Sequence, residues 1–291
     1  MQALRRYKWA IAFFVGPAAI LYTYFVIVPI FASFSYSLTR WDAISEPIFI
    51  GMQNYRRFAA DVNFSLVMSN TLKGLFWSLV IQVSFGLAFA YLIYRTRVGF
   101  RVYRALVFLP VVLSAAAVAL MFTLVFNADV GAVNAALRAV GLGGLTRNWL
   151  SDTRVVYYTV LTPMIYQFVG LYVVILLAGM MSIPEEVIES STIDGAGSFR
   201  TFFSIVIPMQ SDIIFVCVVM ITTGLMTAFE HSYIMTWGGP GSHSAFLGVY
   251  MYFRTFIEAR FGFGAAVAMV ILFGSLFFTL IFQRISKRFD Y

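Results

Sequence analysis

This 291-residue chain contains a series of long apolar runs without charged residues, which leave it few ways to fold. The segments 105–126, 155–181 and 262–283 contain no Asp, Glu, Lys or Arg. About 20 residues of helix cross the hydrocarbon core of a bilayer, so apolar runs of this length predict membrane spans. Charged residues make up only 11% of the chain, whereas a soluble domain has about a quarter. We therefore expect an all-α integral membrane protein.

Six membrane spans can be placed, and no soluble domain fits between them. The expected spans cover about 9–37, 68–94, 105–126, 155–181, 211–232 and 262–283. The first span is longer than a bilayer requires and contains Pro17 and Pro29, so it must tilt, kink or begin with an interfacial piece. A short helix is also expected outside the membrane from Val133 to Val140. Residues 1–291 are accordingly predicted to form a single transmembrane domain.

The basic residues gather at three places, which predicts the orientation of the chain. Half of the 20 Lys and Arg residues precede the first span, fill the turn between the second and third spans, or follow the last span: Arg5, Arg6, Lys8, Arg95, Arg97, Arg101, Arg104, Arg284, Lys287 and Arg288. Cytoplasmic loops are rich in Lys and Arg, so both termini are expected in the cytoplasm. Because these residues do not form one patch, the net charge of +7 does not predict nucleic-acid binding.

A polar segment, 182–210, separates the fourth and fifth expected spans. Ser182 and Glu185 have the spacing of a capping box, which predicts a short helix over about 183–193. Three carboxylates lie near the positive end of this helix dipole, which favours them: Glu185, Glu186 and Glu189. Gly195 is expected to end the helix in the left-handed conformation.

A second short helix is expected from Ser198 onwards. Four apolar residues follow helical spacing and predict one apolar stripe: Phe199, Phe202, Phe203 and Val206. Pro208 is expected to break the backbone before the fifth span. The sequence therefore predicts two short helices that are joined at a glycine and move as one body on the cytoplasmic face.

The spacing within this segment resembles the EAA loop of ABC-importer permeases, by which such a permease docks on its ATPase. That motif has a Glu and two small residues, three further residues, a Gly, nine residues, and an apolar-x-apolar-Pro ending. Here Glu189-Ser190-Ser191 stands three residues before Gly195, and nine residues separate Gly195 from Ile205-Val206-Ile207-Pro208. Asp194-Gly195-Ala196 also matches the common Asp-Gly-Ala form. The chain departs from the pattern at Ser190 and Ser191, where alanines are usual, and at Ile207, where Leu is usual.

The resemblance extends over nearly the whole chain, to the carbohydrate-type permeases of the maltose and glycerol-phosphate kind. The further matching fragments are Trp41, Asn54-Tyr55, Phe108-Leu109-Pro110, Asn148-Trp149-Leu150 and Trp237-Gly238-Gly239-Pro240. The resemblance implies a type I importer architecture. It also implies that the following residues couple the chain to an ATPase: Glu185, Glu186, Glu189, Ser190, Ser191, Asp194, Gly195, Ala196, Phe199 and Phe202.

The resemblance implies several partners in the cytoplasmic (inner) membrane of a bacterium or archaeon. These are a dimer of ABC ATPase subunits, a second permease that is usually a different chain, an extracytoplasmic solute-binding protein and membrane lipid. The binding protein would deliver a sugar or related polyol to the outer loops, including 38–67 and 233–260. The chain has no P-loop, since its lysines are only Lys8, Lys73 and Lys287. We therefore expect no enzyme activity, cofactor or metal site in this chain, with ATP and Mg used by the ATPase.

Polar residues within spans indicate where a solute could pass, since they are costly in lipid and usually face a cavity. The expected pathway residues are Tyr166 and Gln167 in the fourth span and Thr222 and Thr223 in the fifth. Hydrogen bonding between helices is an alternative role for each. At the level of function, the alternatives are a secondary transporter or channel with a cytoplasmic hairpin, and a scaffold protein that transports nothing. The two histidines, His231 and His243, form no metal-binding pattern.

Overall fold

The computed structural model describes residues 8–96 and 99–286, and these are helical apart from loops and one small two-stranded sheet. Five basic residues used above to predict the orientation lie outside the described residues: Arg5, Arg6, Arg97, Lys287 and Arg288. Contacts between Cα atoms divide the chain into two compact units, one of Met1–Ala60 with Met251–Val270 and one of Asp61–Tyr250 with Ile271–Tyr291. The single domain expected from the sequence stays a prediction.

The first unit begins with an interrupted helix. Helix α2 (Lys8–Tyr22) is followed by a π-helical turn at Thr23–Ile27 and by α3 (Val28–Ser37). Pro29 is the second residue of α3 and follows directly on the π-helical turn. The chain stays helical through this turn and Pro17 lies inside α2, so the tilt or kink expected at the two prolines stays a prediction.

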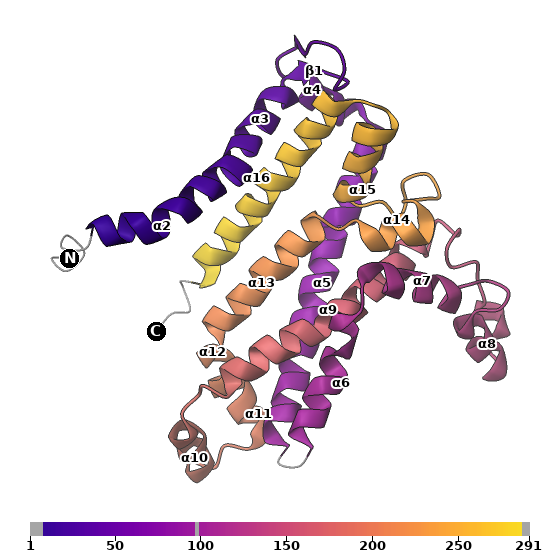
Figure 1. Cartoon of the computed structure of the whole chain (residues 1–291). Coiled ribbons are helices and arrows are strands. Elements are labelled where there is room, and N and C mark those ends of the chain that lie inside the picture. The colour runs from indigo at the N-terminus through magenta and orange to yellow at the C-terminus, as the bar shows by residue number, and fades with distance from the viewer. Residues whose placement is uncertain (1–7, 97–98, 287–291) are drawn as a thin grey trace. The chain divides into compact units, whose positions relative to one another are not determined.

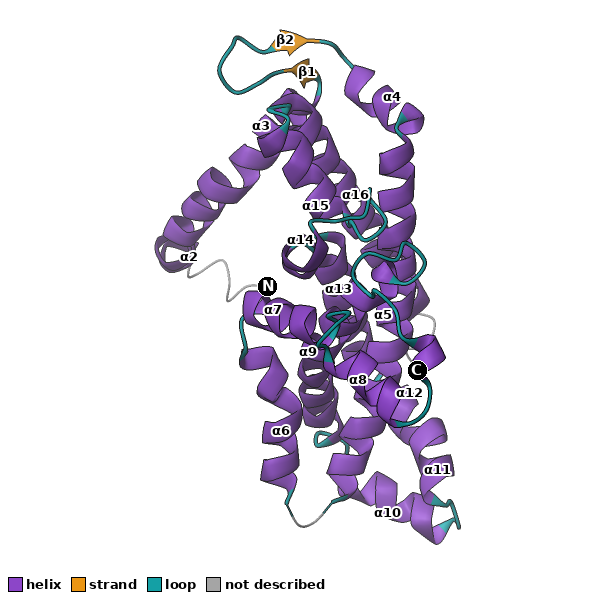
Figure 2. Ribbon diagram, turned by 90° about the vertical axis from the view of Figure 1, so that its right-hand side faces the viewer, coloured by secondary structure: helices purple, strands orange, loops and turns teal. Residues whose placement is uncertain are grey.

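A small hairpin and a short helix follow, as Figure 2 shows. The elements are β1 (Thr39–Arg40), β2 (Ile48–Phe49) and α4 (Gln53–Ala60). The buried Asn54 ties α4 to the hairpin, because its amide donates to the carbonyls of Ser37 and Thr39 at 2.8 and 2.9 Å. Within the same unit, helix α16 (Phe261–Ser286) begins against this hairpin. A Cβ atom at Gly262 would lie 2.1 Å from the carbonyl oxygen of Thr39, so only glycine allows this approach.

The second unit is built on two long helices, α5 (Val62–Arg95) and α9 (Val156–Met180), which pack against each other (Figure 1). Asp61 caps α5 by accepting from the amide of Asn63 at 2.9 Å. The remaining helices are α6 (Phe100–Val112), α7 (Ala115–Val125), α8 (Ala132–Ala139), α10 (Glu185–Ile193), α11 (Ser198–Thr201), α12 (Ile207–Met209), α13 (Ser211–Met226), α14 (Glu230–Thr236) and α15 (Leu247–Tyr252). Helix α8 confirms the short helix expected at 133–140.

The third expected span is present as two helices that pass together as one span, but it is sharply bent rather than straight. Helices α6 and α7 meet at Leu113 and Ser114 with an angle of 91° between them. Pro110 removes a helical donor near the break. Ser114 caps the new helix by accepting from the amide of Ala117 at 3.2 Å. Gln167 of α9 donates its amide to the free carbonyl of Leu113 at 2.9 Å. At the break, the carbonyl of Leu113 and the amide of Ala117 therefore both have hydrogen-bond partners.

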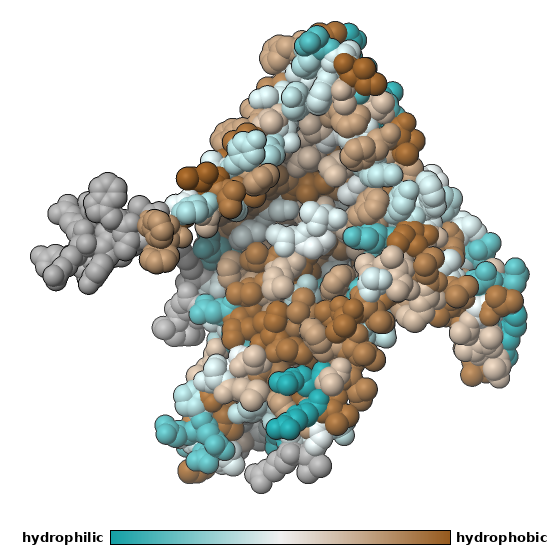
Figure 3. Space-filling view, viewed as in Figure 1, coloured by the Kyte–Doolittle hydropathy of each residue, from teal (hydrophilic) through white to brown (hydrophobic). Residues whose placement is uncertain are grey.

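The other expected spans agree with helices that are long and apolar enough to cross a membrane. The candidate spans are Phe13–Ser37, Val62–Arg95, Val156–Met180, Ser211–Thr236 and Phe261–Ser286, and the bent pair of α6 and α7 makes a sixth when counted as one span. Many large apolar side chains on these helices are exposed, as expected for contact with lipid. Figure 3 shows hydrophobic side chains over much of the visible face and hydrophilic ones gathered over α10.

Candidate functional site

The first candidate site is the polar segment 182–210, which we call the coupling segment. Its first helix, α10, begins at Glu185 after Pro184, without a capping side chain. The predicted capping box was wrong, because the hydroxyl of Ser182 donates to the carbonyl of Gly179 at 2.7 Å. The Ser182 hydroxyl thus bonds to the C-terminal end of α9 and does not cap α10. Glu185 and Glu186 still lie in the first turn, where the helix dipole favours carboxylates.

Gly195 ends α10 as predicted from the sequence. Its φ of 75° lies in the left-handed region that favours glycine. The amide of Gly195 donates to the backbone carbonyl of Thr192 at 3.1 Å, and the amide of Ala196 donates to the backbone carbonyl of Ser191 at 2.9 Å. These two bonds form a Schellman motif. The motif fixes the direction in which the chain leaves α10 and enters α11.

The second of the two serines lies between the helices of the coupling segment. Ser191 is 5% exposed, and its hydroxyl donates to the carbonyl of Ile188 at 2.7 Å and lies 3.4 Å from the hydroxyl of Thr201 in α11. A larger side chain would separate the two helices here. Ser190 is exposed, and its hydroxyl donates to the carbonyl of Glu186 in its own helix at 2.7 Å. Packing within the chain therefore restricts residue size at Ser191 and not at Ser190.

Apolar contacts anchor the coupling segment to the spans. Val206 is fully buried in a cluster with residues of α5, α9 and α13, among them Leu87, Leu176 and Cys217. Val187, Ile188, Phe202 and Ile207 pack against the same cluster. A movement of the segment must therefore move these spans or break a well-packed core.

A polar contact also joins the coupling segment to the end of α5. The hydroxyl of Tyr91 donates to the carbonyl of Ser198 at 3.0 Å, and its ring lies 4.7 Å from that of Phe202. Arg95 donates to the hydroxyl of Ser198, and its guanidinium lies 5.9 Å from the centre of the Tyr91 ring. Tyr91 and Arg95 were not among the predicted site residues, since nothing in the local sequence pairs them with Ser198.

The opposite face of the coupling segment is exposed. Its large apolar side chains are Ile193 at 86% exposed, Phe199 at 78% and Phe203 at 51%. The acidic and small polar residues around them are also exposed: Glu185, Glu186, Glu189, Ser190 and Asp194. A shallow depression of about 330 Å³ runs along α10 between Glu186, Asp194 and Ile205. An exposed surface of this composition suits docking of a protein partner.

The predicted apolar stripe is divided between the two faces, so its description as one stripe was wrong. Phe202 and Val206 face the core, whereas Phe199 and Phe203 are exposed with ring centres 4.6 Å apart. The π-helical turn at Phe202–Val206 explains the division, because it alters the 3.6-residue period on which the prediction rested.

The second candidate site is a cavity of about 370 Å³ within the second unit, between α5, α9, α13 and α14. Its polar lining includes Ser78, Gln82, Thr227, Glu230 and His231, and its aromatic lining includes Phe168, Tyr172 and Phe229. His231 is 3% exposed, and its Nε2 atom has no hydrogen-bond partner among the described residues. Gln82 is also buried. Amide, carboxylate and hydroxyl groups beside aromatic faces can bind a polyhydroxylated solute.

None of the four predicted pathway residues lines this cavity. Gln167 supports the break between α6 and α7, and Tyr166 lies with its ring 5.4 Å from that of Phe122. Thr222 and Thr223 donate to carbonyls of their own helix at 2.7 and 2.9 Å. Their role in transport stays a prediction. The same signal, a polar residue within a span, also marks Gln82 and Glu230, but sequence alone does not show which helix faces meet.

Comparison with known proteins identifies the family. The sequence model described as the binding-protein-dependent transport system inner membrane component matches residues 82–291. The chain belongs to this family. The matched region contains the coupling segment and most of the cavity lining, so the two candidate sites lie in the part of this permease that defines the family.

Relatives along the whole length agree with this family. The permease is 35% identical over 272 residues to the probable ABC transporter permease protein YurN of Bacillus subtilis, covering 92% of this chain and 93% of the relative. It is 29% identical over 290 residues to the multiple sugar-binding transport system permease protein MsmF of Streptococcus mutans, covering 99% and 98%. A chain of a bacterial ABC transporter that imports alginate has the same fold, with a TM-score of 0.84, 20% identity and coverage of 100% and 99%.

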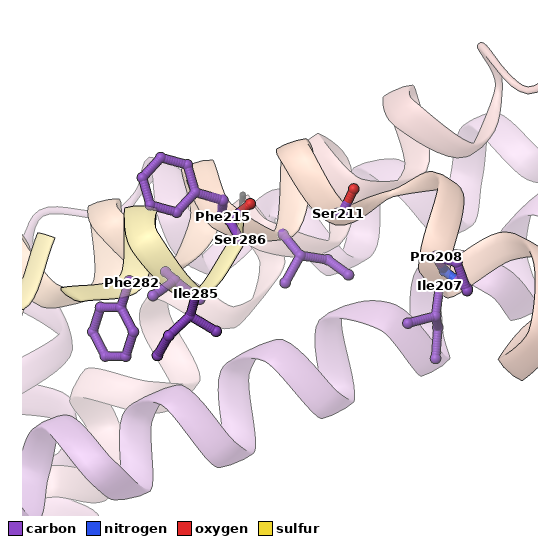
Figure 4. A pocket seen from close by; sticks show the side chains of 9 residues that line it. Ile207, Pro208, Ser211, Phe215, Phe282, Ile285 and Ser286 are labelled. Carbon is purple, nitrogen blue, oxygen red and sulfur yellow. The ribbon is translucent and has the colours of Figure 1, made fainter. Parts of the chain in front are cut away.

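The permease also has a larger cavity of about 460 Å³, which Figure 4 shows between α12, α13 and the end of α16. It is lined by Ile207, Pro208, Ser211, Ile214, Phe215, Val218, Phe282, Ile285 and Ser286. Only the two serines offer side-chain hydrogen bonds. A sugar in this cavity would lose most of its hydrogen bonds to water without replacement. The smaller, polar cavity is therefore the better candidate for the solute pathway.

Proposed function

We propose that this permease is the membrane-spanning subunit of an ATP-driven importer for a carbohydrate or related polyol. Its place would be the cytoplasmic membrane of a bacterium or archaeon. A second permease, usually a different chain in such importers, would complete the pathway. A pair of ATPase subunits would bind and hydrolyse ATP with Mg, and an extracytoplasmic binding protein would deliver the solute.

The main support for the proposal is that the coupling segment has two different faces. One face is exposed and combines carboxylates with Ile193, Phe199 and Phe203. The other face is anchored through Val206 to α5, α9 and α13. The same three helices line the polar cavity. A displacement applied to the exposed face by an ATPase would therefore reach the helices that surround the solute.

The solute class is proposed from the cavity and from the names of relatives. The cavity offers the amide of Gln82, the carboxylate of Glu230 and the ring of Phe168. A hexose fits within about 370 Å³, the volume of this cavity. The relatives include the S. mutans sugar permease above and the trehalose/maltose transport system permease protein MalF of Thermococcus litoralis, which is 26% identical over 264 residues.

The proposal is tested by transport in liposomes. The permease is purified with the subunits that copurify and reconstituted, and uptake of radiolabelled sugars is measured with ATP inside and binding protein outside. Uptake that requires both is expected. Uptake that needs no ATP and stops when ion gradients are dissipated would favour a secondary transporter instead, and an assembly without uptake or solute-dependent ATP turnover would favour a scaffold.

The same assay tests which residues contact the solute. Gln82→Leu removes a buried amide of the cavity and is expected to lower uptake at unchanged assembly. Thr123→Val is the matched control, because the Thr123 hydroxyl bonds to the carbonyl of Ala119 in its own helix and does not line the cavity. Equal uptake by both variants would remove Gln82 from the pathway.

A further inference from the structure

The first unit contains a second polar pocket, which has no part in the sites above. It has a volume of about 280 Å³, and three arginines line it: Arg40 of β1, Arg57 of α4 and Arg260. Trp41 and Phe263 supply its aromatic lining. All of its lining residues belong to this one unit. We call it the arginine pocket.

The walls of the arginine pocket are held by contacts within the unit. The ring of Trp41 stacks on Tyr36 at 4.3 Å, and its indole N–H donates to the carbonyl of Ser45 at 2.8 Å. The carbonyl of Trp41 accepts from the amide of Gly262 at 3.1 Å. Asn54, also in the lining, is the buried residue that ties α4 to the hairpin. The pocket is thus formed before any ligand arrives, which reduces the entropy lost on binding.

The carboxylate that lines the pocket, Asp42, forms hydrogen bonds with its own turn and, among the described residues, no ion pair with the three arginines. Asp42 accepts from the amides of Ile44 and Ser45 at 3.0 and 2.8 Å and from the Ser45 hydroxyl at 2.7 Å. The Arg40 guanidinium has no hydrogen-bond or ion-pair partner among the described residues. Within the part of the chain that the structure describes, the polar contact of the Arg57 guanidinium is one of 3.5 Å with the side chain of Gln53.

Arg260 is the arginine of the pocket that has a carboxylate partner. Its guanidinium lies 3.2 Å from Glu258, which also pairs with Arg254 at 2.6 Å. One carboxylate is thus shared by two arginines. Among the described residues, the three guanidinium groups are thus balanced only in part, by Asp42 and by the shared Glu258, so the arginine pocket keeps a net positive charge.

We propose that the arginine pocket binds an Asp or Glu side chain of the extracytoplasmic binding protein. This rests on the proposed function and on the orientation predicted from the sequence, in which the loop 38–67 lies on the outer face. Guanidinium groups bind carboxylates through paired hydrogen bonds, and a pocket with several of them selects an acidic group over other side chains.

The surroundings of the pocket favour a protein over a free acidic sugar. Large apolar side chains next to it are exposed, with Ile44 at 94%, Ile48 at 52%, Phe49 at 72% and Met52 at 56%. A protein interface combines such an apolar surface with a charged anchor, whereas a sugar acid would contact the pocket alone. The acidic side chain would fix the register of docking, and the apolar residues around it would exclude water.

Neighbouring arginines of α4 provide a matched test. Arg57 lines the pocket, whereas Arg56 is exposed beside it and does not. The purified transporter complex in nanodiscs is titrated with the solute-binding protein of the same importer. Arg57→Gln and Arg40→Gln are expected to weaken binding about tenfold or more, because each removes a charge-assisted bond. Arg56→Gln is expected to leave binding unchanged. Higher salt should weaken wild-type binding more than binding by the Arg57→Gln variant.

The outcomes separate the pocket from the proposed function. If the Arg56→Gln and Arg57→Gln variants bind the solute-binding protein equally well, and the wild-type complex also binds it, the role proposed for the pocket is wrong and the proposed function stands. Displacement of the binding protein by millimolar galacturonate would assign the pocket to an acidic sugar and also overturn the proposal. A wild-type complex that binds no such protein would overturn the proposed function and the pocket together. Rescue of Arg57→Glu by an acid-to-Arg change in the binding protein would identify the docked side chain.

Discussion

Gly195 provides the sharpest test of the coupling segment, because its role can be separated from packing. A Cβ atom at this position would meet no atom within 4 Å, so Gly195→Ala creates no clash. The substitution instead forces alanine into the left-handed conformation at a φ of 75°, which costs about 1–2 kcal/mol. The exposed turn can relax more easily than the buried core below it. We therefore expect the strain to change the direction in which α10 leads into α11.

A strain of this size corresponds to a factor of about 5–30 in an equilibrium constant. The affinity of the copurifying ATPase for the permease is expected to fall by that factor in Gly195→Ala, measured by titration in nanodiscs. Gly197→Ala is the matched control, since its φ is −69° and it is equally open. Thermal unfolding of the spans should be nearly the same in both variants. Equal ATPase affinities for the two variants would refute the role of the left-handed turn.

Three further predictions concern hydrogen bonds. Gln167→Leu leaves the Leu113 carbonyl without its amide donor and should cost about 1–3 kcal/mol; an unchanged thermal midpoint of the purified permease would contradict this. Tyr91→Phe keeps the ring on Phe202 but removes the bond to Ser198, so more ATP should be hydrolysed per solute transported; an unchanged ratio would remove the contact from coupling. Hydrogen bonds from Ser45 lower the pKa of Asp42 from its usual 3.8 to about 2. The ionised Asp42 therefore stabilises the turn fully above its usual pKa of 3.8, and this stabilisation is lost as the pH falls through about 2. The indole N–H resonance of Trp41 should report this loss, and a change near neutral pH would contradict it.

The positions of the spans follow from sequence because length and apolarity alone decide whether a helix can cross a bilayer. The break in the third span could not be predicted from the sequence in this way. Pro110 is visible in the sequence, but the 91° angle depends on Ser114 and on Gln167, which lies 54 residues away along the chain. A polar residue in a span was correctly recognised as unusual, yet its partner is set by tertiary structure.

The same distinction applies to the candidate sites. Gly195 could be predicted because a helix end is a local event. The capping box failed because the carbonyl of Gly179, at the end of another helix, takes the Ser182 hydroxyl. Gln82 and Gln167 are both buried amides within spans, but only the first lines the polar cavity. The difference lies in which helix faces meet, and a single sequence contains no direct record of that.

The proposed importer requires that an ATPase bind the exposed face of the coupling segment. A photo-crosslinking amino acid replaces Ile193, which is 86% exposed on that face, and Val130, which is 81% exposed in the turn between α7 and α8, serves as the control. After illumination of the assembled complex, mass spectrometry should identify a P-loop ATPase crosslinked at position 193 and none at position 130. Failure to capture an ATPase at position 193, or equal capture at both positions, would contradict the binding of an ATPase to this face.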